Sequence, residues 1–311
     1  MSFDEYCLEQ FPSDDTVFYL WQNRPSVIIG LNQNVYSEVN VQYLEDNGII
    51  LARRVTGGGA VYHDLQNLNY TIVGRSRDLE RDYPGFMHFM LDALRQLGVP
   101  AELSGRNDIM VEGRKVSGYA KRVFKDRLMV HGTLMFDVDL EHLTAALAVP
   151  GSKLQASGIE SVRSRVANLK DYLPQFSTVK DMQDALQDIM SDGDGEIFLN
   201  DAQRADIQRI CDEKFSTWEW NFGKSPKATF HNSRKFSCGT VIADWSIVKG
   251  SVEGLVFSGD FLGNLPAGQL AERINGLRFD RSTVSAALNE EPVGRFFDGI
   301  TAGGLVELLF S

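Results

Sequence analysis

The sequence predicts an α+β protein with a large N-terminal domain and a small accessory domain. Strand-like and helix-like segments alternate irregularly as far as WEWNFG, which ends at Gly223. Lys224-Ser225-Pro226 then has the composition of a linker. Beyond it, residues 228–262 alternate like a small antiparallel sheet, and residues 266–308 have a mostly helical pattern. We therefore expect one α+β domain over 1–223 and a second over 224–311.

Turn residues and apolar spacing predict the first elements. Residues 17–31 favour a hairpin that turns at Gln22–Pro25, because TVFYLW and SVIIGL are both strand-like. A short helix over 40–47 is expected to end at Gly48. IILARRV and LNYTIVG are predicted strands on either side of a glycine loop.

Helical periodicity becomes clear further along the chain. Residues 84–97 place apolar side chains on one helical face, with Pro84 in the first turn and Gly98 after the last. DIMV and RKVSGYAKRV favour a hairpin around Glu112-Gly113, and MVHGTLMFDVD favours a strand. Further helices are expected near 139–148, 178–190 and 200–214.

Composition indicates an ordinary globular chain. Of its 311 residues, 43% are hydrophobic and 23% are charged. No apolar run approaches the roughly 18 residues of a membrane helix, and the N-terminal segment MSFDEYCLEQ lacks a basic start and an apolar run. The three cysteines, Cys7, Cys211 and Cys238, are too few and too irregularly spaced for a disulfide framework or a cysteine-rich metal site. We expect a cytoplasmic protein without a membrane partner.

The charge distribution argues against nucleic acid as a partner. Lys and Arg total 31 against 42 Asp and Glu, a net charge of −11. One segment departs from this balance: residues 106–127 contain seven bases and three acids, a local net charge of +4. Residues 171–213 contain eleven acids and three bases. The basic segment favours an anionic ligand nearby, although two solvated faces of opposite sign would give the same pattern.

The segment ARRVTGGGAVYHD is the most informative part of the chain. Gly57, Gly58 and Gly59 remove every Cβ from one stretch, so a ligand can approach the backbone and successive N–H groups can face anionic oxygens. Arg53 and Arg54 precede it and can grip phosphate. The spacing is neither that of a P-loop nor GxGxxG. The segment therefore predicts an anion-binding loop, with a flexible strand connection as the alternative.

A second informative segment surrounds Lys115. Small residues follow it in GRKVSGYA, which leaves room for a ligand beside its amine. A lysine is the cation that an adenylation reaction needs, because the carboxylate and the α-phosphate repel each other. Asp108 is a candidate ligand for Mg²⁺ on the phosphates. A solvated Arg-Lys pair and a structural Asp turn would explain the same residues, and His63 and His131 are more often structural than catalytic.

These segments together resemble the lipoate–protein ligase A family. The matching pieces occur in order: ARRVTGGGAVYHD, NLNYT, GRNDI, GRKVSGYAKR, HGTLMFDVDL and SVRSRVANL, with WEWNFGKSP as the hinge. The resemblance covers nearly the whole chain. It implies a large mixed-sheet domain shared with biotin ligases and octanoyltransferases, followed by an accessory domain that we expect to act as a lid.

The resemblance also implies a reaction, its cofactors and its partners. Lipoate and ATP, with Mg²⁺, would give lipoyl-AMP, and a lysine of an acceptor domain would then take the lipoyl group. Acceptors would be the lipoyl domains of 2-oxoacid dehydrogenase complexes or the glycine cleavage H protein. Lys115 corresponds to the lysine that contacts lipoate and the α-phosphate. The nucleotide and lipoyl-AMP would be bound by Arg54, Gly57, Gly58, Gly59, Ala60, Val61, Tyr62, His63, Asn69, Arg106 and Thr133.

The sequence departs from the family pattern at a few positions. Tyr119 stands where a small or amide residue is common, and a bulky ring close to Lys115 is expected to reshape the acyl pocket. Gln66 and Val130 replace a common glycine and a common histidine. The family usually has an opening strand before the segment that MSFDEYCLEQ matches, and the given sequence starts at that segment.

Three other functions remain open at this point. An octanoyltransferase of the same fold would use no ATP and would need a cysteine nucleophile, but no cysteine lies between Cys7 and Cys211. A biotin ligase would need a Gly-Arg-Gly-Arg type of loop, which this chain lacks. A non-catalytic relative that binds lipoate or a lipoylated domain would show no lipoate-dependent release of pyrophosphate.

Overall fold

The computed structural model describes residues 1–12, 15–76, 79–104, 107–147, 164–191 and 195–310. Within them the chain forms two compact units, one made of 1–31 with 38–217 and the other of 32–37 with 218–311. Each unit is described by itself below. The division into functional domains at residue 223 stays a prediction.

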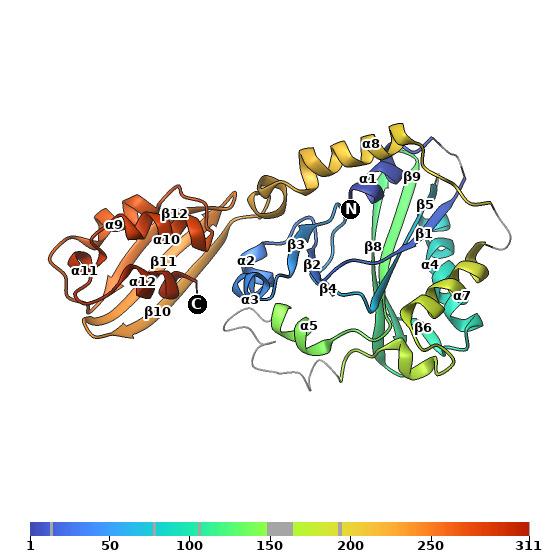
Figure 1. Ribbon diagram of the computed structural model, residues 1–311, viewed down its shortest axis with the longest axis horizontal. Helices are drawn as coiled ribbons and strands as arrows, with labels where there is room; N and C mark the ends of the chain where they lie inside the picture. Colours follow the sequence, from blue (N-terminus) through green and yellow to red (C-terminus); the bar gives the residue numbers. More distant parts are fainter. Residues whose placement is uncertain (13–14, 77–78, 105–106, 148–163, 192–194, 311) are drawn as a thin grey trace. The chain divides into compact units, whose positions relative to one another are not determined.

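An antiparallel sheet forms the centre of the first unit (Figure 1). Its strand order is β1-β5-β9-β8-β7-β6, and every neighbouring pair is antiparallel. The hairpin expected around Glu112-Gly113 is confirmed, because β7 pairs with β8 there. The strands are β1 (Val17–Trp21), β5 (Asn67–Arg75), β6 (Ala101–Ser104), β7 (Asp108–Val111), β8 (Arg114–Phe124) and β9 (Arg127–Met135).

Mixed pairing occurs in a second, smaller sheet. Its central strand β2 (Ser26–Ile29) runs parallel to β3 (Ile50–Arg53) and antiparallel to β4 (Val61–His63). The expected hairpin over residues 17–31 is therefore wrong: β1 pairs with β5, and β2 joins a different sheet. Local turn residues did not indicate this, because both segments are strand-like and their partners lie far along the chain.

The two faces of the large sheet have different roles. Leu68, Tyr70 and Ile72 of β5 belong to a core under α4 (Leu79–Gln96) and α7 (Val179–Ser191), which cover one face (Figure 1). Because side chains alternate along a strand, residues such as Thr71 must point to the opposite face. That second face carries α1 (Ser2–Glu9), whose Asp4 accepts a hydrogen bond from Thr71. Polar positions of β5 and its neighbours therefore converge on the side away from the core.

The remaining helices of the first unit follow the sequence expectations closely. Gly48, with φ +62°, ends the helix predicted over 40–47. The helix predicted from Pro84 begins earlier, and Pro84 lies inside it. The elements are α3 (Val41–Asp46), α5 (Leu140–Leu147), the 3-10 turn Leu169–Tyr172, α8 (Asp201–Ile210) and the π-helical turn Cys211–Phe215.

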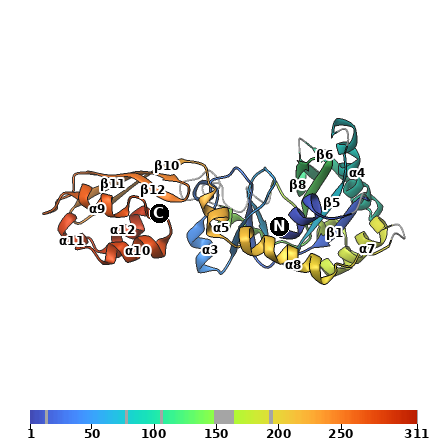
Figure 2. The same ribbon diagram turned by 90° about the horizontal axis from the view of Figure 1, so that it is seen from above.

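The second unit is a three-stranded antiparallel sheet with helices on one face (Figure 2). Alternate residues of its central strand, Val241, Ala243, Trp245 and Ile247, are buried. A short early segment belongs to this unit, because α2 (Val35–Glu38) places Tyr36 against Phe222, Phe230 and Phe279. The other elements are the π-helical turn Glu219–Gly223, β10 (Ala228–Phe236), β11 (Gly239–Val248), β12 (Ser251–Gly259), α9 (Ala267–Ile274), α10 (Arg281–Asn289), α11 (Val293–Phe296) and α12 (Ala302–Leu309).

The length and hydropathy of the helices bear on whether one could cross a membrane. In the described ranges, none is both long enough and apolar enough to span a bilayer.

Candidate active site

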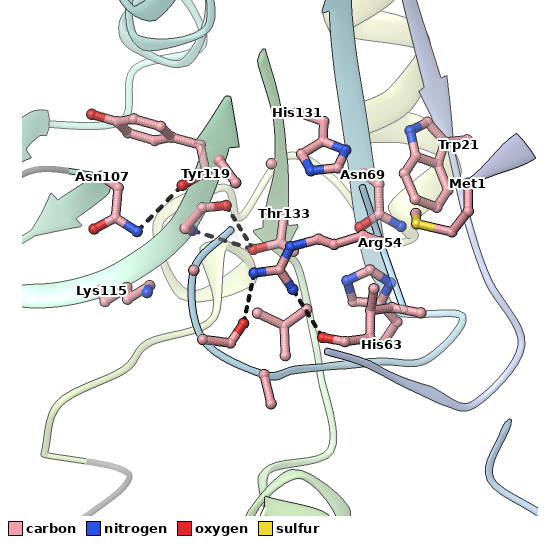
Figure 3. Close-up of a pocket in the computed structure, with 18 residues that line it drawn as sticks. Met1, Trp21, Arg54, His63, Asn69, Asn107, Lys115, Tyr119, His131 and Thr133 are labelled. Atoms are coloured by element: carbon pink, nitrogen blue, oxygen red, sulfur yellow. Dashed lines mark hydrogen bonds between the residues drawn. The ribbon is translucent and has the colours of Figure 1, made fainter. Parts of the chain in front are cut away.

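A cavity lies on the polar face of the large sheet, in the first unit (Figure 3). The glycine loop, the β8 segment around Lys115 and the facing residues of β5 and β9 form its walls. Nine residues expected at the site line it: Arg54, Gly58, Gly59, Ala60, Val61, His63, Asn69, Lys115 and Thr133. Segments about 80 residues apart in sequence thus meet at one place, while the binding roles of these residues stay a prediction.

Arg54 holds the glycine loop in shape. Its side chain is buried, and its guanidinium donates to the carbonyl oxygens of Gly57 (2.7 Å), Gly59 (2.8 Å) and Ile28 (3.0 Å). Its Nε–H also donates to Thr56 Oγ1 at 3.0 Å. Burial lowers the pKa of Arg54 to about 10, so it stays charged at neutral pH. The sequence indicated a phosphate-gripping arginine, whereas here the planar fork binds the loop backbone.

This arrangement turns a loop N–H away from Arg54. In a trans peptide the C=O of one residue and the N–H of the next point in opposite directions. Since the Gly57 carbonyl faces Arg54, the Gly58 N–H faces away, and it makes no hydrogen bond to another described residue. Gly58 also has φ +94°, which disfavours other residues. A preorganised donor at a glycine position lining the cavity suits an anionic ligand.

Lys115 and Asp108 form an ion pair at the other side of the cavity. Lys115 Nζ lies 2.7 Å from Asp108 Oδ1, and each side chain is about one-third exposed, at 33% and 32%. Gly118 makes room for the pair: a Cβ there would lie 2.8 Å from Lys115 Nζ and 2.9 Å from its Cε. The small residue that the sequence placed near Lys115 is therefore required for the position of the amine.

Gly118→Ala is expected to move Lys115 without unfolding the chain. The clash involves only the flexible end of a side chain, so the free energy of unfolding should change by less than about 1 kcal/mol. Displacement of the amine should lower kcat/KM of the adenylation that the family resemblance implies, measured as exchange of pyrophosphate with ATP, roughly tenfold or more. The double variant Gly118→Ala, Lys115→Ala should be no slower than Lys115→Ala alone. Additive losses would show that Gly118 acts independently of the lysine.

Two buried polar groups lining the cavity lack a partner within the described residues. Asn69 Oδ1 accepts from Asn67 Nδ2 at 2.9 Å, whereas Asn69 Nδ2 has none. His63 Nδ1 lies 3.1 Å from Asn23 Nδ2, and His63 Nε2 has none. Burial and then the charge of Arg54 lower the pKa of His63 to about 3, so it is neutral near pH 7. An unpaired buried polar atom is costly, which favours a ligand that supplies the missing partners.

Some expected residues lie apart from the cavity. Gly57 contributes its carbonyl to Arg54 and does not line the cavity. Tyr62 points to the other face of β4, where it stacks on His142 with ring centroids 6.4 Å apart. Burial, and then Asp64, raise the pKa of Tyr62 to about 12. Arg106 lies outside the described residues.

Other residues line the cavity that were not among the expected binding residues; of these, the sequence had drawn attention to Gly118, Tyr119 and His131. Trp21 sits opposite Asn69 in the β1–β5 pairing and forms a wall, a placement that only the strand register reveals. Tyr119 also borders the cavity, but its side chain belongs to the core under α4. The other additions are Met1, Ile28, Asn107, Gly118, Ala120, His131 and Gly132.

Some cations of the basic segment, residues 106–127, contact other side chains of the first unit. Arg122 lies 2.9 Å from Glu9 Oε1 and 3.6 Å from Glu5 Oε2, and Lys121 Nζ lies 3.5 Å from the centre of the Tyr83 ring. The local charge of +4 that the sequence shows is thus partly neutralised by neighbouring acids.

A lysine, a backbone donor and unpaired polar groups around one cavity make a site that suits an anionic ligand. The family model for the lipoyl protein ligase A/B catalytic domain matches residues 1–191, and that for the bacterial lipoate protein ligase C-terminus matches residues 225–309. The chain belongs to the lipoate–protein ligase family. Curated relatives include lipoate-protein ligase LplJ of Bacillus subtilis, 36% identical over all of this chain and 96% of the relative. Lipoate–protein ligase 1 of Staphylococcus aureus is 35% identical over 99% of this chain and 95% of its own.

Solved structures give the same result for the fold. A bipartite lipoate protein ligase from Thermoplasma acidophilum, studied with its E2 lipoyl domain, has a TM-score of 0.65 and 33% identity, covering 73% of this chain and 92% of that one. A lipoate-protein ligase A bound with ATP has a TM-score of 0.63 and 32% identity, covering 72% and 92%. A further T. acidophilum structure, described as a lipoate protein ligase with bound lipoic acid, has a TM-score of 0.61 and 32% identity, covering 71% and 92%.

Proposed function

We propose that this protein is an ATP-dependent lipoate–protein ligase that forms lipoyl-AMP and transfers the lipoyl group to a lysine of an acceptor domain. Its main support is the shared cavity of Lys115 and the glycine loop, in a chain that aligns over its full length with lipoate–protein ligases. Relatives solved with ATP and with lipoic acid support both substrates.

In the first half-reaction, a carboxylate oxygen of lipoate attacks the α-phosphorus of ATP, and the bond to pyrophosphate breaks. Both reactants are negatively charged, so their approach is unfavourable without a cation. The Lys115 amine supplies a fixed positive charge, and the Gly58 N–H supplies a donor that needs little reorganisation. His63 Nε2 and Asn69 Nδ2 are unpaired donors that a bound substrate would satisfy.

In the second half-reaction, the neutral amine of an acceptor lysine attacks the carbonyl carbon of lipoyl-AMP. An amide bond forms, the bond between the carbonyl carbon and the phosphate oxygen breaks, and AMP leaves while the amine loses its proton. Lys115 would stabilise the phosphate charge that is released. We infer that acceptors are lipoyl domains of 2-oxoacid dehydrogenase complexes or the glycine cleavage H protein; the relative solved with an E2 lipoyl domain supports the first.

We also propose Mg²⁺ as the metal, with Asp108 as its protein ligand. The described residues contain no group of three His, Cys, Asp or Glu side chains that could hold a metal by themselves. Mg²⁺ at nucleotides usually takes only one or two carboxylates together with phosphate oxygens, so one carboxylate is sufficient. Asp108 does not line the cavity, but its ion pair with Lys115 holds it next to a residue that does. When bound, the ion neutralises phosphate charge.

Lipoate-dependent exchange between ATP and pyrophosphate tests this function. The full-length chain should catalyse exchange with lipoate, with octanoate and biotin as comparisons, and should label an acceptor lysine when a lipoyl domain is added. Transfer without ATP would instead indicate the acyltransferase. Tight lipoate binding without exchange would indicate a non-catalytic relative.

The cysteines are expected to be dispensable for turnover. All three are free, and none lines the cavity. Burial and then Asp4 raise the pKa of Cys7 to about 12, which makes it a poor nucleophile. The triple change Cys7→Ala, Cys211→Ser, Cys238→Ser should keep kcat of lipoyl transfer within about twofold, with some loss of melting temperature. Complete loss of transfer in a folded triple variant would favour an acyl-thioester route.

A further inference from the structure

A buried carboxylate lies behind the site, on a helix that none of the binding motifs includes. Asp4 of α1 is only 1% exposed. Its Oδ1 accepts from Tyr19 Oη (2.5 Å) and Thr71 Oγ1 (3.0 Å), and its Oδ2 accepts from His131 Nδ1 (3.2 Å). Burial of a carboxylate is costly unless it is hydrogen-bonded, and here three donors compensate. Asp4 does not line the cavity, so it can affect a ligand only through its neighbours.

A hydrogen-bond chain connects this carboxylate to the glycine loop. Because a carboxylate only accepts, Nδ1 of His131 is the donor to Asp4, and in the tautomer with its proton on Nδ1 the Nε2 atom is an acceptor. Nε2 lies 2.7 Å from Thr56 Oγ1, so the threonine hydroxyl donates to it. The oxygen of Thr56 in turn accepts Arg54 Nε–H at 3.0 Å. Donors and acceptors are consistent at every step from Arg54 to Asp4.

The chain ends at the residue that shapes the loop. Arg54 holds the Gly57 and Gly59 carbonyls, and this turns the Gly58 N–H away from the guanidinium. Arg54 Nε–H has two acceptors, Thr56 Oγ1 at 3.0 Å and the Gly57 carbonyl at 3.2 Å. If the Thr56 hydroxyl lost its orientation, the shorter of these two hydrogen bonds would be lost, and the side chain and the loop carbonyls that it holds would shift. A buried cation at one end and a buried anion at the other also stabilise each other across the polar chain.

We propose that Asp4 and Thr56, linked by His131, are positioning residues that fix Arg54 and thereby the anion-binding conformation of the glycine loop. The expected loss of pyrophosphate exchange rests on the proposed function, whereas the expected effect on the position of Arg54 and the loop does not. It assigns a role in the site to α1, which lies about 50 residues before the glycine loop in sequence.

A matched control separates this role from simple anchoring of α1. Tyr19→Phe removes one hydrogen bond to the same carboxylate but leaves the His131–Thr56–Arg54 chain intact. Tyr19 does not line the cavity. Both Tyr19→Phe and Asp4→Asn should lower the melting temperature, whereas only Asp4→Asn should weaken the link to Arg54.

The kinetic test measures kcat and KM of lipoate-dependent pyrophosphate exchange in the full-length chain. Asp4→Asn and Thr56→Val should lower kcat/KM roughly 10- to 100-fold, since small displacements of positioned groups have effects of this size. Thr56→Ser, which keeps the hydroxyl, should restore most of the rate, and Tyr19→Phe should retain it. Wild-type kinetics in folded Asp4→Asn and Thr56→Val, or an equal loss in Tyr19→Phe, would overturn the proposal.

A second measurement does not depend on catalysis. In protein labelled with ¹⁵N at arginine and histidine, NMR should show a slowly exchanging Arg54 Nε–H and the Nδ1–H tautomer of His131. Hydrogen exchange of the Arg54 Nε–H with solvent should become faster in Asp4→Asn and Thr56→Val but not in Tyr19→Phe. A wild-type protein without pyrophosphate exchange would contradict the proposed function, but the NMR measurement would still test the positioning role. An unchanged rate of hydrogen exchange at Arg54 Nε–H in both Asp4→Asn and Thr56→Val would refute the positioning role.

Discussion

Replacing Lys115 with alanine should lower lipoate-dependent pyrophosphate exchange by roughly 10²–10³-fold, the usual effect of losing one preorganised charged contact. Lys115 Nζ lies beside Asp108 at the cavity, where the carboxylate and the α-phosphate would meet. Its side chain is one-third exposed, at 33%, so truncation leaves no buried void. The variant should therefore stay folded, and the loss should appear mainly in kcat, because the charge acts on the transition state.

A neighbouring lysine provides the control. Lys121 lies on the same strand, but its amine sits over the Tyr83 ring and it does not line the cavity. Lys121→Ala should lower the exchange rate by less than about twofold. Comparison of melting temperatures shows whether both variants are folded. A folded Lys115→Ala chain with near-normal exchange would remove Lys115 from the chemistry and leave the lysine with only its ion pair to Asp108.

The sequence predicted those parts of the molecule that depend on local chemistry. Glycines without Cβ atoms, a lysine among small residues and the periodicity of 84–97 can each be recognised within a single segment. The α+β class, the hairpin at Glu112-Gly113 and the small antiparallel sheet of the second unit are confirmed for this reason. The family pattern also placed nine site residues that the structure brings to one cavity.

The features of the fold and site that the sequence did not predict depend on pairing between distant strands and on the choice of hydrogen-bond partners. Trp21 reaches the cavity only because β1 pairs with β5 rather than with β2. Arg54 is recognisable as a cation, but no local pattern shows that its donors are taken up by the carbonyls of Ile28, Gly57 and Gly59. Tyr119 was expected beside Lys115, and simple alternation would keep the two side chains on one face of β8. The pairing of β8 with β7 shifts register between Lys115 and Ser117, and the Tyr119 ring packs in the core.

The three glycines of the loop should differ sharply when each is replaced by alanine. Gly58→Ala should have the larger effect, because its φ of +94° is unfavourable for alanine and a Cβ would lie 2.9 Å from Arg54 Nη2. The backbone strain should cost about 1–3 kcal/mol of stability. Movement of Arg54 or of the Gly58 N–H should also lower kcat/KM of exchange by about 10²-fold. Thermal unfolding and exchange kinetics measure the two effects separately.

Gly57→Ala is the matched control one residue earlier. Its backbone is outside the left-handed region, a Cβ would meet no atom within 4 Å, and Gly57 does not line the cavity. Stability should change by less than about 0.5 kcal/mol, with pyrophosphate exchange close to wild type.

Gly59 is intermediate: a Cβ there also meets no atom within 4 Å, but Gly59 lines the cavity, so Gly59→Ala should raise KM without lowering the melting temperature. Equal losses in all three variants would show that the loop needs flexibility throughout, and not the particular backbone geometry that Arg54 holds at Gly58.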